Sequence, residues 1–247
     1  MARQMLFYER VVPLSATRHG KWSVAPAGDY GFAAGVNSLP LMVSEFAAAA
    51  RDLPIVFVVD DHGAVPTVVI GLEAGGNAMV DGEGRWRGRY VPAFVRRYPF
   101  VFSASPEGKT LTLCIDESFA GFDPKGRRGE RMFDEAGART ASLERALAFT
   151  RSFQDEHHRS RRFGAMLKDL GLLAPAAAQA KGEGAGPSLA GFHCVDRAKL
   201  KGLDAERLKE LMTSDALELV FLHLASLGNF DTLAVLAARA RAERVVQ

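Results

Sequence analysis

Short apolar runs, broken by proline and glycine, recur in the first half of the chain at a fixed offset of 45 residues. The run RDLPIVF from Arg51 aligns with RRYPFVF from Arg96, and seven of the twenty aligned positions from 51 to 70 are identical. A duplicated unit that cannot bury its own apolar face must pack against another surface. The pattern predicts a helix–hairpin unit repeated over residues 40–72 and 91–116, with its strands in one largely antiparallel sheet or in two sheets on a common core.

Proline and glycine set the limits of the elements that we predict. The first helix spans residues 40–52, because proline suits the first turn of a helix and the residue before Pro54 avoids the helical region. The second helix begins at Pro92 and ends before Pro99. Asp81-Gly82 indicates a smaller hairpin between the two units. The strands of the two main hairpins are 55–59 with 67–72, and 100–104 with 110–116.

Helical patterning dominates the second half of the chain. Residues 140–173 are predicted to form two helical segments that meet near Gly164. Residues 174–188, rich in alanine, glycine and proline, are typical of a flexible linker. A strand at 190–195 and helices follow, and the last apolar stripe needs an apolar partner; it comprises Leu217, Val220, Phe221, Leu224 and Leu227. The fold class is therefore α+β, with one domain over 1–173, a linker at 174–188, and a C-terminal strand and helices over 189–247 that dock on the same domain.

Composition narrows the classes of protein that this chain can represent. At 247 residues, with 48% hydrophobic and 24% charged residues, it can bury a sizeable core. A net charge of +2 gives no strong electrostatic footprint for nucleic acid. The longest apolar runs have the length of strands, so we expect no membrane-spanning segment. The N-terminal run MARQMLFYERVVPL lacks the pattern of a secretory signal, which predicts a cytoplasmic protein.

Signatures of metal or catalytic chemistry are missing from the sequence. His157 and His158 are adjacent on a predicted helix, so their side chains diverge by about 100°. Cys114 and Cys194 lie in apolar runs and are expected to be buried free thiols. The sequence contains no nucleophile elbow, no phosphate-binding loop and no dinucleotide-binding fingerprint. We therefore predict no metal, no cofactor and no catalytic residue, and the sequence leaves the oligomeric state open.

Arginines interleaved with aromatic residues mark the best binding candidate. Guanidinium groups beside aromatic rings suit recognition of an anion or a peptide by charge and stacking. The alternative is a solvated face on which arginine stems cover apolar surface. Arg97 is favoured over Arg96, because Arg96 has a counterpart in the repeat, Arg51, which indicates a structural role. The predicted ligand- or partner-binding residues are Asn77, Trp86, Arg96, Arg97 and Tyr98.

Several segments together resemble the SapC family of bacterial proteins over nearly the whole chain. They are NSLP from residue 37, LPIVF from 53, NAMVD from 77, YVPA from 90, RRYPF from 96 and LCID from 113. Leu53 and Ala78-Met79 are mild departures from the family pattern. The resemblance implies an association with bacterial surface-layer proteins and with genes for TonB-dependent receptors and halogenase-like flavoproteins. It implies no reaction and no catalytic residues.

Two functions follow as hypotheses. The first is a non-catalytic accessory or binding protein that recognises a peptide or partner protein in surface-layer or TonB-linked uptake systems. The second is an enzyme with an unrecognised site that acts on a peptide or amino-acid derivative. For that enzyme, Glu45, Asp116 and Glu117 are the carboxylates of interest, because two of them end a predicted buried strand.

Overall fold

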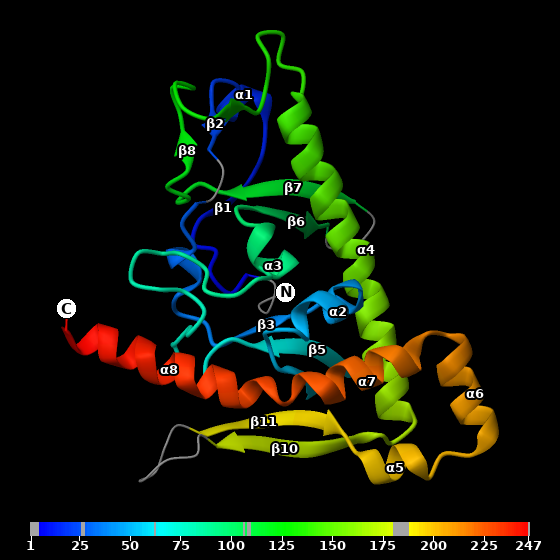
Figure 1. Cartoon of the computed structure of the whole chain (residues 1–247). Helices are drawn as coiled ribbons and strands as arrows, with labels where there is room; N and C mark the ends of the chain where they lie inside the picture. The colour runs from blue at the N-terminus through cyan, green and yellow to red at the C-terminus, as the bar shows by residue number, and fades with distance from the viewer. Residues whose placement is uncertain are drawn as a thin grey trace. The chain divides into compact units, whose positions relative to one another are not determined.

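The described chain divides by packing into two compact units, each made of two separate segments. The computed structural model describes residues 5–25, 28–61, 63–105, 107, 110–179 and 188–246. Unit 1 comprises residues 1–28 and 94–154, and unit 2 comprises residues 29–93 and 155–247. Figure 1 labels most of the helices and strands of both units. The mixture of helices with antiparallel sheets confirms the predicted α+β class.

Unit 1 contains two small antiparallel sheets. One has the strand order β1-β7-β6, and the other has the order β8-β2-β9. Its helices are α1 (Ala16–His19), most of α3 (Ala93–Arg96) and the first part of α4 (Ala141–Asp169). The strands are β1 (Val11–Pro13), β2 (Ser23–Val24), β6 (Phe100–Ala104), β7 (Leu111–Asp116), β8 (Phe122–Asp123) and β9 (Glu130–Arg131).

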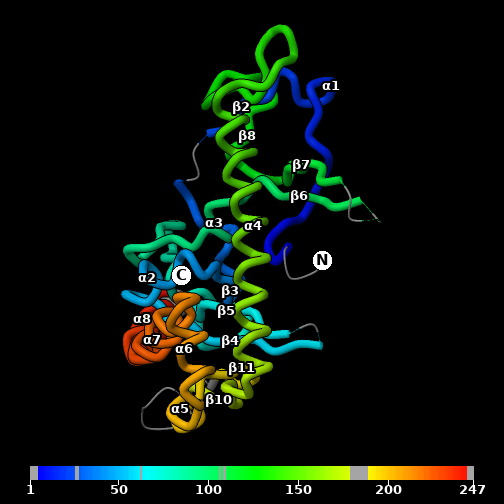
Figure 2. Tube along the Cα trace, turned by 90° about the vertical axis from the view of Figure 1, so that its right-hand side faces the viewer, coloured from blue at the N-terminus to red at the C-terminus, as the bar shows by residue number. Residues whose placement is uncertain are grey.

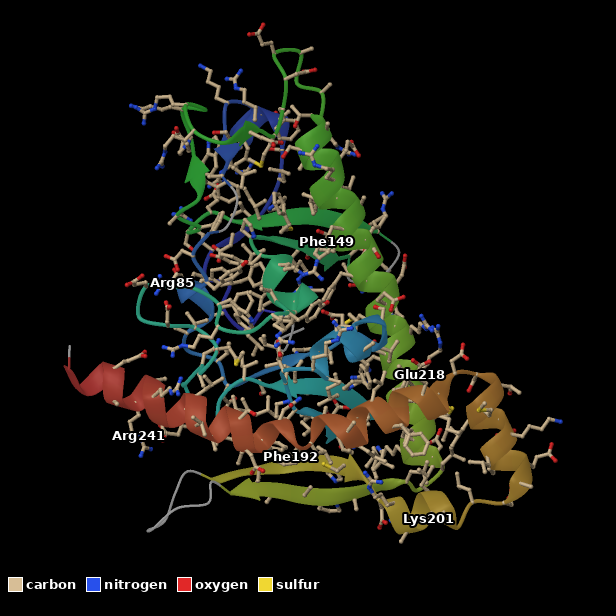
Figure 3. All side chains as sticks on the ribbon, in the orientation of Figure 1. Arg85, Phe149, Phe192, Lys201, Glu218 and Arg241 are labelled. Atoms are coloured by element: carbon tan, nitrogen blue, oxygen red, sulfur yellow. The ribbon has the colours of Figure 1, made fainter. Side chains whose placement is uncertain are left out.

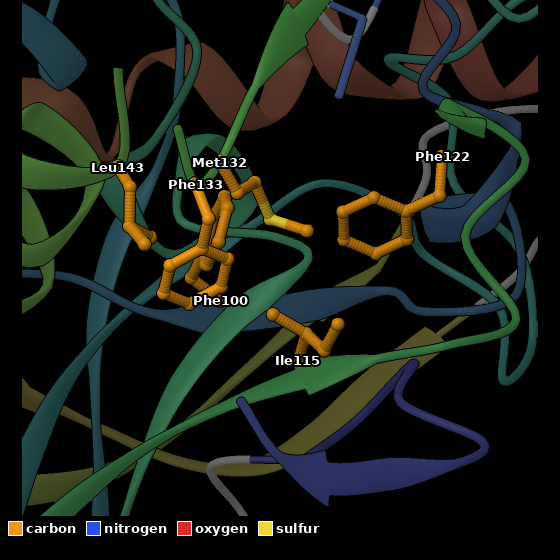
Figure 4. Close-up of a cluster of buried hydrophobic side chains, with 6 residues drawn as sticks. All are labelled: Phe100, Ile115, Phe122, Met132, Phe133 and Leu143. Carbon is orange, nitrogen blue, oxygen red and sulfur yellow. The ribbon is translucent and has the colours of Figure 1, made fainter. Parts of the chain in front are cut away.

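The core of unit 1 gathers apolar side chains from both sheets and from α4 (Figure 4). Each member of this cluster is at most 8% exposed, and the members are Phe100, Ile115, Phe122, Met132, Phe133 and Leu143. Phe122, Met132 and Phe133 come from the polar, glycine-rich stretch that follows Ser118. These apolar residues therefore anchor an otherwise hydrophilic segment to the core.

Unit 2 is built on one five-stranded antiparallel sheet with the order β10-β11-β4-β5-β3, which can be followed in Figure 2. The strands are β3 (Ser38–Pro40), β4 (Ile55–Asp60), β5 (Gly63–Val69), β10 (Leu173–Gln179) and β11 (Ser188–Val195). Helix α7 packs on β4 and β11. The helical elements are η2 (Gly31–Ala33), η3 (Val43–Glu45), α2 (Phe46–Ala49), the second part of α4, α5 (Arg197–Lys201), α6 (Ala205–Thr213), α7 (Ala216–Ser226) and α8 (Asn229–Val246).

Both predicted main hairpins form, although β5 spans Gly63–Val69 and not the predicted 67–72. In the first, Ile55 pairs with Val68, and in the second, Phe100 pairs with Ile115. The second hairpin has the longer loop, because its last pair is Ala104 with Leu111. The two hairpins lie in separate sheets, one in each unit. That they descend from a duplicated helix–hairpin unit stays a prediction.

The predicted helix over residues 40–52 is mostly wrong. Residues Ser38–Pro40 form strand β3, which pairs with β5, and only Phe46–Ala49 is α-helical. Leu39, Leu41, Met42 and Val43 are all buried. A helix in this position would turn some of these apolar side chains toward solvent, so pairing with the sheet is favoured over intrinsic helix propensity.

The predicted linker over residues 174–188 is also corrected where the structure describes it. Residues 174–179 belong to β10 and residue 188 begins β11, with Leu173 paired to Val195 and Gln179 paired to Ser188. Residues 180–187 lie outside the described residues. Alanine is a poor strand former by itself, but backbone hydrogen bonds to a neighbouring strand do not depend on the side chain.

The C-terminal helices agree in part with the predicted apolar stripe. Val220 and Leu224 are buried, whereas Phe221 is 52% exposed and does not join the core. Among the described residues, no single helix has the length and apolar character needed to cross a membrane. The pair α7 and α8, bent by 45°, passes that test together by length and composition only.

Helix α4 is one continuous helix of 29 residues, so the predicted break at Gly164 is absent. Gly164 instead allows close packing, because a Cβ there would lie 1.9 Å from the carbonyl oxygen of Ala64 in β5. The glycine is thus explained by contact with the sheet of unit 2.

We expect Gly164→Ala to destabilise the protein by about 1–3 kcal/mol through overpacking against β5. Helix propensity alone predicts the opposite sign, a gain of about 1 kcal/mol. Urea unfolding measures the difference, with Ser152→Ala on the exposed face of the same helix as the control. A stabilised Gly164→Ala variant would contradict the close contact.

His223 joins α7 to the sheet of unit 2. Its Nδ1 lies 2.7 Å from the carbonyl oxygen of Ile55, and its Nε2 accepts the backbone N–H of Val195 at 3.0 Å. The proton therefore resides on Nδ1 and the ring is neutral. Burial lowers the pKa of His223 to about 4.

Protonation of His223 should make stability depend on pH. In the unfolded chain the ring titrates near its ordinary value of 6.5, so below this pH the unfolded state binds the proton more readily. We expect a loss of about 3 kcal/mol as the pH falls from 7 toward 4. Urea unfolding across this range, compared with His223→Gln, isolates the contribution. An equal slope in both proteins would argue against it.

Candidate binding site

The structure divides the five predicted binding residues between the two units. Asn77 and Trp86 lie in unit 2, whereas Arg96, Arg97 and Tyr98 lie in unit 1.

In unit 2, Asn77 and Trp86 hold the backbone. Asn77 is buried, donates from Nδ2 to the carbonyl oxygen of Ala33 at 3.0 Å, and accepts the N–H of Met79 at 2.8 Å. The indole N–H of Trp86 donates to the carbonyl oxygen of Tyr90 at 2.9 Å. The predicted small hairpin beside them is reduced to a single bridge between Val80 and Trp86. These hydrogen bonds give both side chains a structural role.

The arginines near Trp86 are paired with carboxylates. Arg85, labelled in Figure 3, contacts Asp81 and Glu83 at 2.9 Å each, and Arg87 pairs with Glu243. A cavity of about 430 Å³ nearby is lined by four carboxylates: Asp29, Asp81, Glu83 and Glu243. This cavity of unit 2 is therefore acidic, which disfavours the binding of an anionic ligand.

In unit 1, Arg97 is buried in an aromatic cage and only 2% exposed. Its guanidinium carbon lies 4.3 Å from the ring centre of Phe153, 4.6 Å from Phe94 and 5.8 Å from Tyr8. Burial lowers the pKa of Arg97, and burial raises the pKa of Tyr8 to about 12 although the arginine opposes this rise. The charge of Arg97 thus stabilises the aromatic cluster, and the predicted preference for Arg97 in binding stays a prediction.

Arg96, one residue earlier, is exposed and stacks on Phe149 of α4 at 5.2 Å. Phe149 is labelled in Figure 3. Both residues line a cavity of about 370 Å³. Most of its lining is apolar, from residues such as Val24, Ala25, Pro99, Phe100, Phe119 and Ala146. The cavity combines an apolar floor with a stacked guanidinium at its edge.

Tyr98 also lines this cavity and is buried. Its ring meets Phe119 edge to face at 5.2 Å, and its hydroxyl lies 3.4 Å from Asp116. Burial raises the pKa of Tyr98. Arg145, on α4, lines the cavity and forms an ion pair with Glu130 at 2.7 Å. Arg145 and Phe149 were not predicted as binding residues from the sequence, although their spacing of four residues places them on one face of a helix.

The carboxylate of Asp116 is fully buried and held by hydrogen bonds. It accepts the backbone N–H groups of Glu9, Arg10 and Ser118 at 2.8 to 3.0 Å, and the hydroxyl of Ser118 at 2.6 Å. Burial by itself would raise the pKa of Asp116, but these donors outweigh it and lower the pKa. The group is thus an acceptor that fixes the chain.

Glu117 and Glu45 are engaged in the same way. Glu117 accepts from Arg18 at 2.7 Å and lies 3.0 Å from Nε2 of the buried His19. Glu45 accepts the hydroxyl of Tyr90 at 2.7 Å and two backbone N–H groups. The three carboxylates considered for an enzyme therefore all have structural partners.

Metal-ligating and thiol groups add no site in the part of the chain that the structure describes. No group of three or more His, Cys, Asp or Glu side chains there could hold a metal ion. Cys114 is buried and Cys194 is half-buried, and both are free thiols. Burial raises the pKa of both, to about 11 for Cys194, so they stay protonated at neutral pH.

The adjacent arginines offer a matched test of burial. We expect Arg97→Ala to destabilise the protein by about 3 kcal/mol, because it removes a buried stem and a cation from the cage. Arg96→Ala loses the same atoms from an exposed position and should cost about 1 kcal/mol or less. Urea unfolding of both variants measures the difference. Equal losses would contradict the caged position of Arg97.

Comparison with known proteins gives one match to a family and none to individual proteins. The description of the matching family is SapC, and the match covers residues 14–233. No curated protein and no solved structure matches the chain. Because the match spans most of the 247 residues, the chain belongs to the SapC family.

Proposed function

We propose that this protein is a non-catalytic accessory or binding protein that recognises a peptide or partner protein through unit 1. The observation that carries the proposal is the cavity of about 370 Å³ in which Arg96 stacks on Phe149 above an apolar floor. Membership of the SapC family supports a role in surface-layer or TonB-linked uptake systems through the association that the resemblance implies.

The lining of this cavity suits two chemical features of a peptide. Its apolar floor can cover an aromatic or aliphatic side chain, which gains stability by leaving water. The planar guanidinium of Arg96 can bind a carboxylate through two parallel hydrogen bonds while it stays stacked on Phe149. A peptide that ends in an aromatic residue with a free carboxylate presents both features.

The remaining predicted residues take supporting roles in this proposal. Tyr98 forms part of the cavity wall, and Arg97 supports the segment that carries Arg96 from its buried cage. Asn77 and Trp86 belong to unit 2 and keep their structural roles there. Arg96 is therefore the residue whose removal should affect binding most directly.

Short peptides test the proposal by calorimetry. The probe is Gly-Gly-Phe with a free C-terminus, and its C-terminal amide is the matched control ligand. We expect Arg96→Ala to weaken binding of the free acid at least about tenfold, or 1.4 kcal/mol. The amide should bind the parent protein as weakly as the free acid binds the variant, because the arginine–carboxylate contact is lost in both cases.

Arg151→Ala is the matched control protein. Arg151 is exposed on the same helix as Phe149 but does not line the cavity, so its removal should leave the affinity unchanged. Circular dichroism checks that each variant is folded. Unchanged affinity in both Arg96→Ala and Phe149→Ala would remove this cavity from consideration. Chemical conversion of the peptide, detected by mass spectrometry, would favour the enzyme alternative.

A further inference from the structure

A second and larger cavity of unit 1 shares no lining residue with the first. It has a volume of about 620 Å³ and is formed by α1, by the turn between α1 and β2, and by the glycine-rich stretch that surrounds β9. Its charged and aromatic lining residues are Arg18, Lys21, Trp22, Arg131, Asp134 and Glu135.

Three cations converge on this cavity. The guanidinium of Arg18 is oriented by Glu117 at 2.7 Å, and Glu117 is itself held by the buried His19. Among the described residues, no carboxylate lies within ion-pair distance of Lys21 or Arg131. Unit 1 contains 14 basic and 9 acidic residues, a net charge of +5, whereas unit 2 contains 17 and 20. Anionic ligands are therefore attracted to unit 1.

Gly126 lets the loop before β9 lie against the backbone of Lys21 and the side chain of Arg131. Its φ of +66° suits glycine, and a Cβ there would lie 2.6 Å from the carbonyl oxygen of Lys21 and 3.1 Å from Nε of Arg131. The loop is fixed by Asp123, whose carboxylate accepts the N–H groups of Lys125 and Arg127 at 3.0 Å each. The loop and the backbone at Lys21 are thus packed before any ligand arrives, which reduces the entropic cost of ordering them on binding.

The rest of the lining is unsuited to a bare anion. Asp134 and Glu135 would repel it, but each carboxylate can accept hydrogen bonds from hydroxyl groups. The half-buried indole of Trp22 is fixed by an edge contact with His19 at 4.9 Å and by Phe122 at 5.6 Å. A flat aromatic surface can stack against the C–H face of a sugar ring, so the lining suits a ligand that has a ring, hydroxyl groups and a negative charge.

We propose that this cavity binds an anionic sugar, a pyranose that carries a carboxylate or a phosphate group. The negative group binds to Arg18, Lys21 and Arg131 through charge-assisted hydrogen bonds. The ring lies on Trp22, and its hydroxyl groups donate to Asp134 and Glu135. This ligand class is distinct from the peptide proposed for the first cavity, so each proposal can fail without the other.

The fluorescence of Trp22 reports binding directly. The chain has two tryptophans, so Trp86→Phe leaves Trp22 as the only indole. The probes are glucuronate, glucose 6-phosphate, glucose and inorganic phosphate. We expect at least one of the two anionic sugars to give a saturable change with a Kd of about 1 mM, and glucose and phosphate to bind at least about tenfold more weakly. If Trp86→Phe does not fold, the indole N–H signal of Trp22 in NMR spectra of the parent protein gives the same readout.

Variants separate a sugar site from a plain anion site. Lys21→Ala and Arg131→Ala should each weaken binding about tenfold, whereas Arg128→Ala, on the same loop but outside the lining, should not. Glu135→Gln should weaken the binding of an anionic sugar, because it removes an acceptor for a hydroxyl group. It should strengthen the binding of a bare anion, because it removes a repulsive charge. The proposal is overturned if neither anionic sugar saturates at about 10 mM. It is equally overturned if phosphate binds as tightly as the sugars and Glu135→Gln improves binding.

Discussion

The buried carboxylate of Asp116 is the constraint on which unit 1 depends. It stands at the end of β7 and accepts N–H groups from Glu9, Arg10 and Ser118, which ties the N-terminal segment to the middle of the chain. Its neighbour Glu117 binds His19 and Arg18 and so fixes α1. Two successive acidic residues thereby determine where the chain enters β1 and where it leaves toward β8. Both cavities of unit 1 are lined by segments that these contacts orient.

The two main hairpins follow from the sequence because local signals and tertiary packing agree there. The predictions that are wrong lie where local signals and tertiary packing disagree. Around Pro40, a run of buried apolar residues that begins in an edge strand resembles the start of a helix. In residues 174–179, the alanines that suggest a linker have their backbone groups bonded to β11. The periodicity of apolar residues indicates which side chains are buried. It does not predict an element that is determined by backbone hydrogen bonds to another strand.

The candidate site shows a similar limit. The sequence predicted binding by the segment with Arg96, Arg97 and Tyr98 and favoured Arg97, which the structure buries. The part of each residue in binding stays a prediction. A helix as short as α3 gives no periodicity from which to predict which arginine turns inward. The cage around Arg97 comes from Tyr8 and Phe153, which are distant in the sequence. Contacts between segments that are so distant in the sequence form only in the folded protein, so local sequence patterns do not predict them.

The division into units has a consequence for how the molecule is made. The chain passes from one unit to the other at residues 28, 93 and 154, so neither unit is a contiguous stretch. During synthesis, β1 cannot pair with β7 until β7 has been made. In the same way, β4 cannot pair with β11, which emerges more than a hundred residues later. No single cut in the gene can release an intact unit, and the strands that wait expose unpaired edges until their partners arrive.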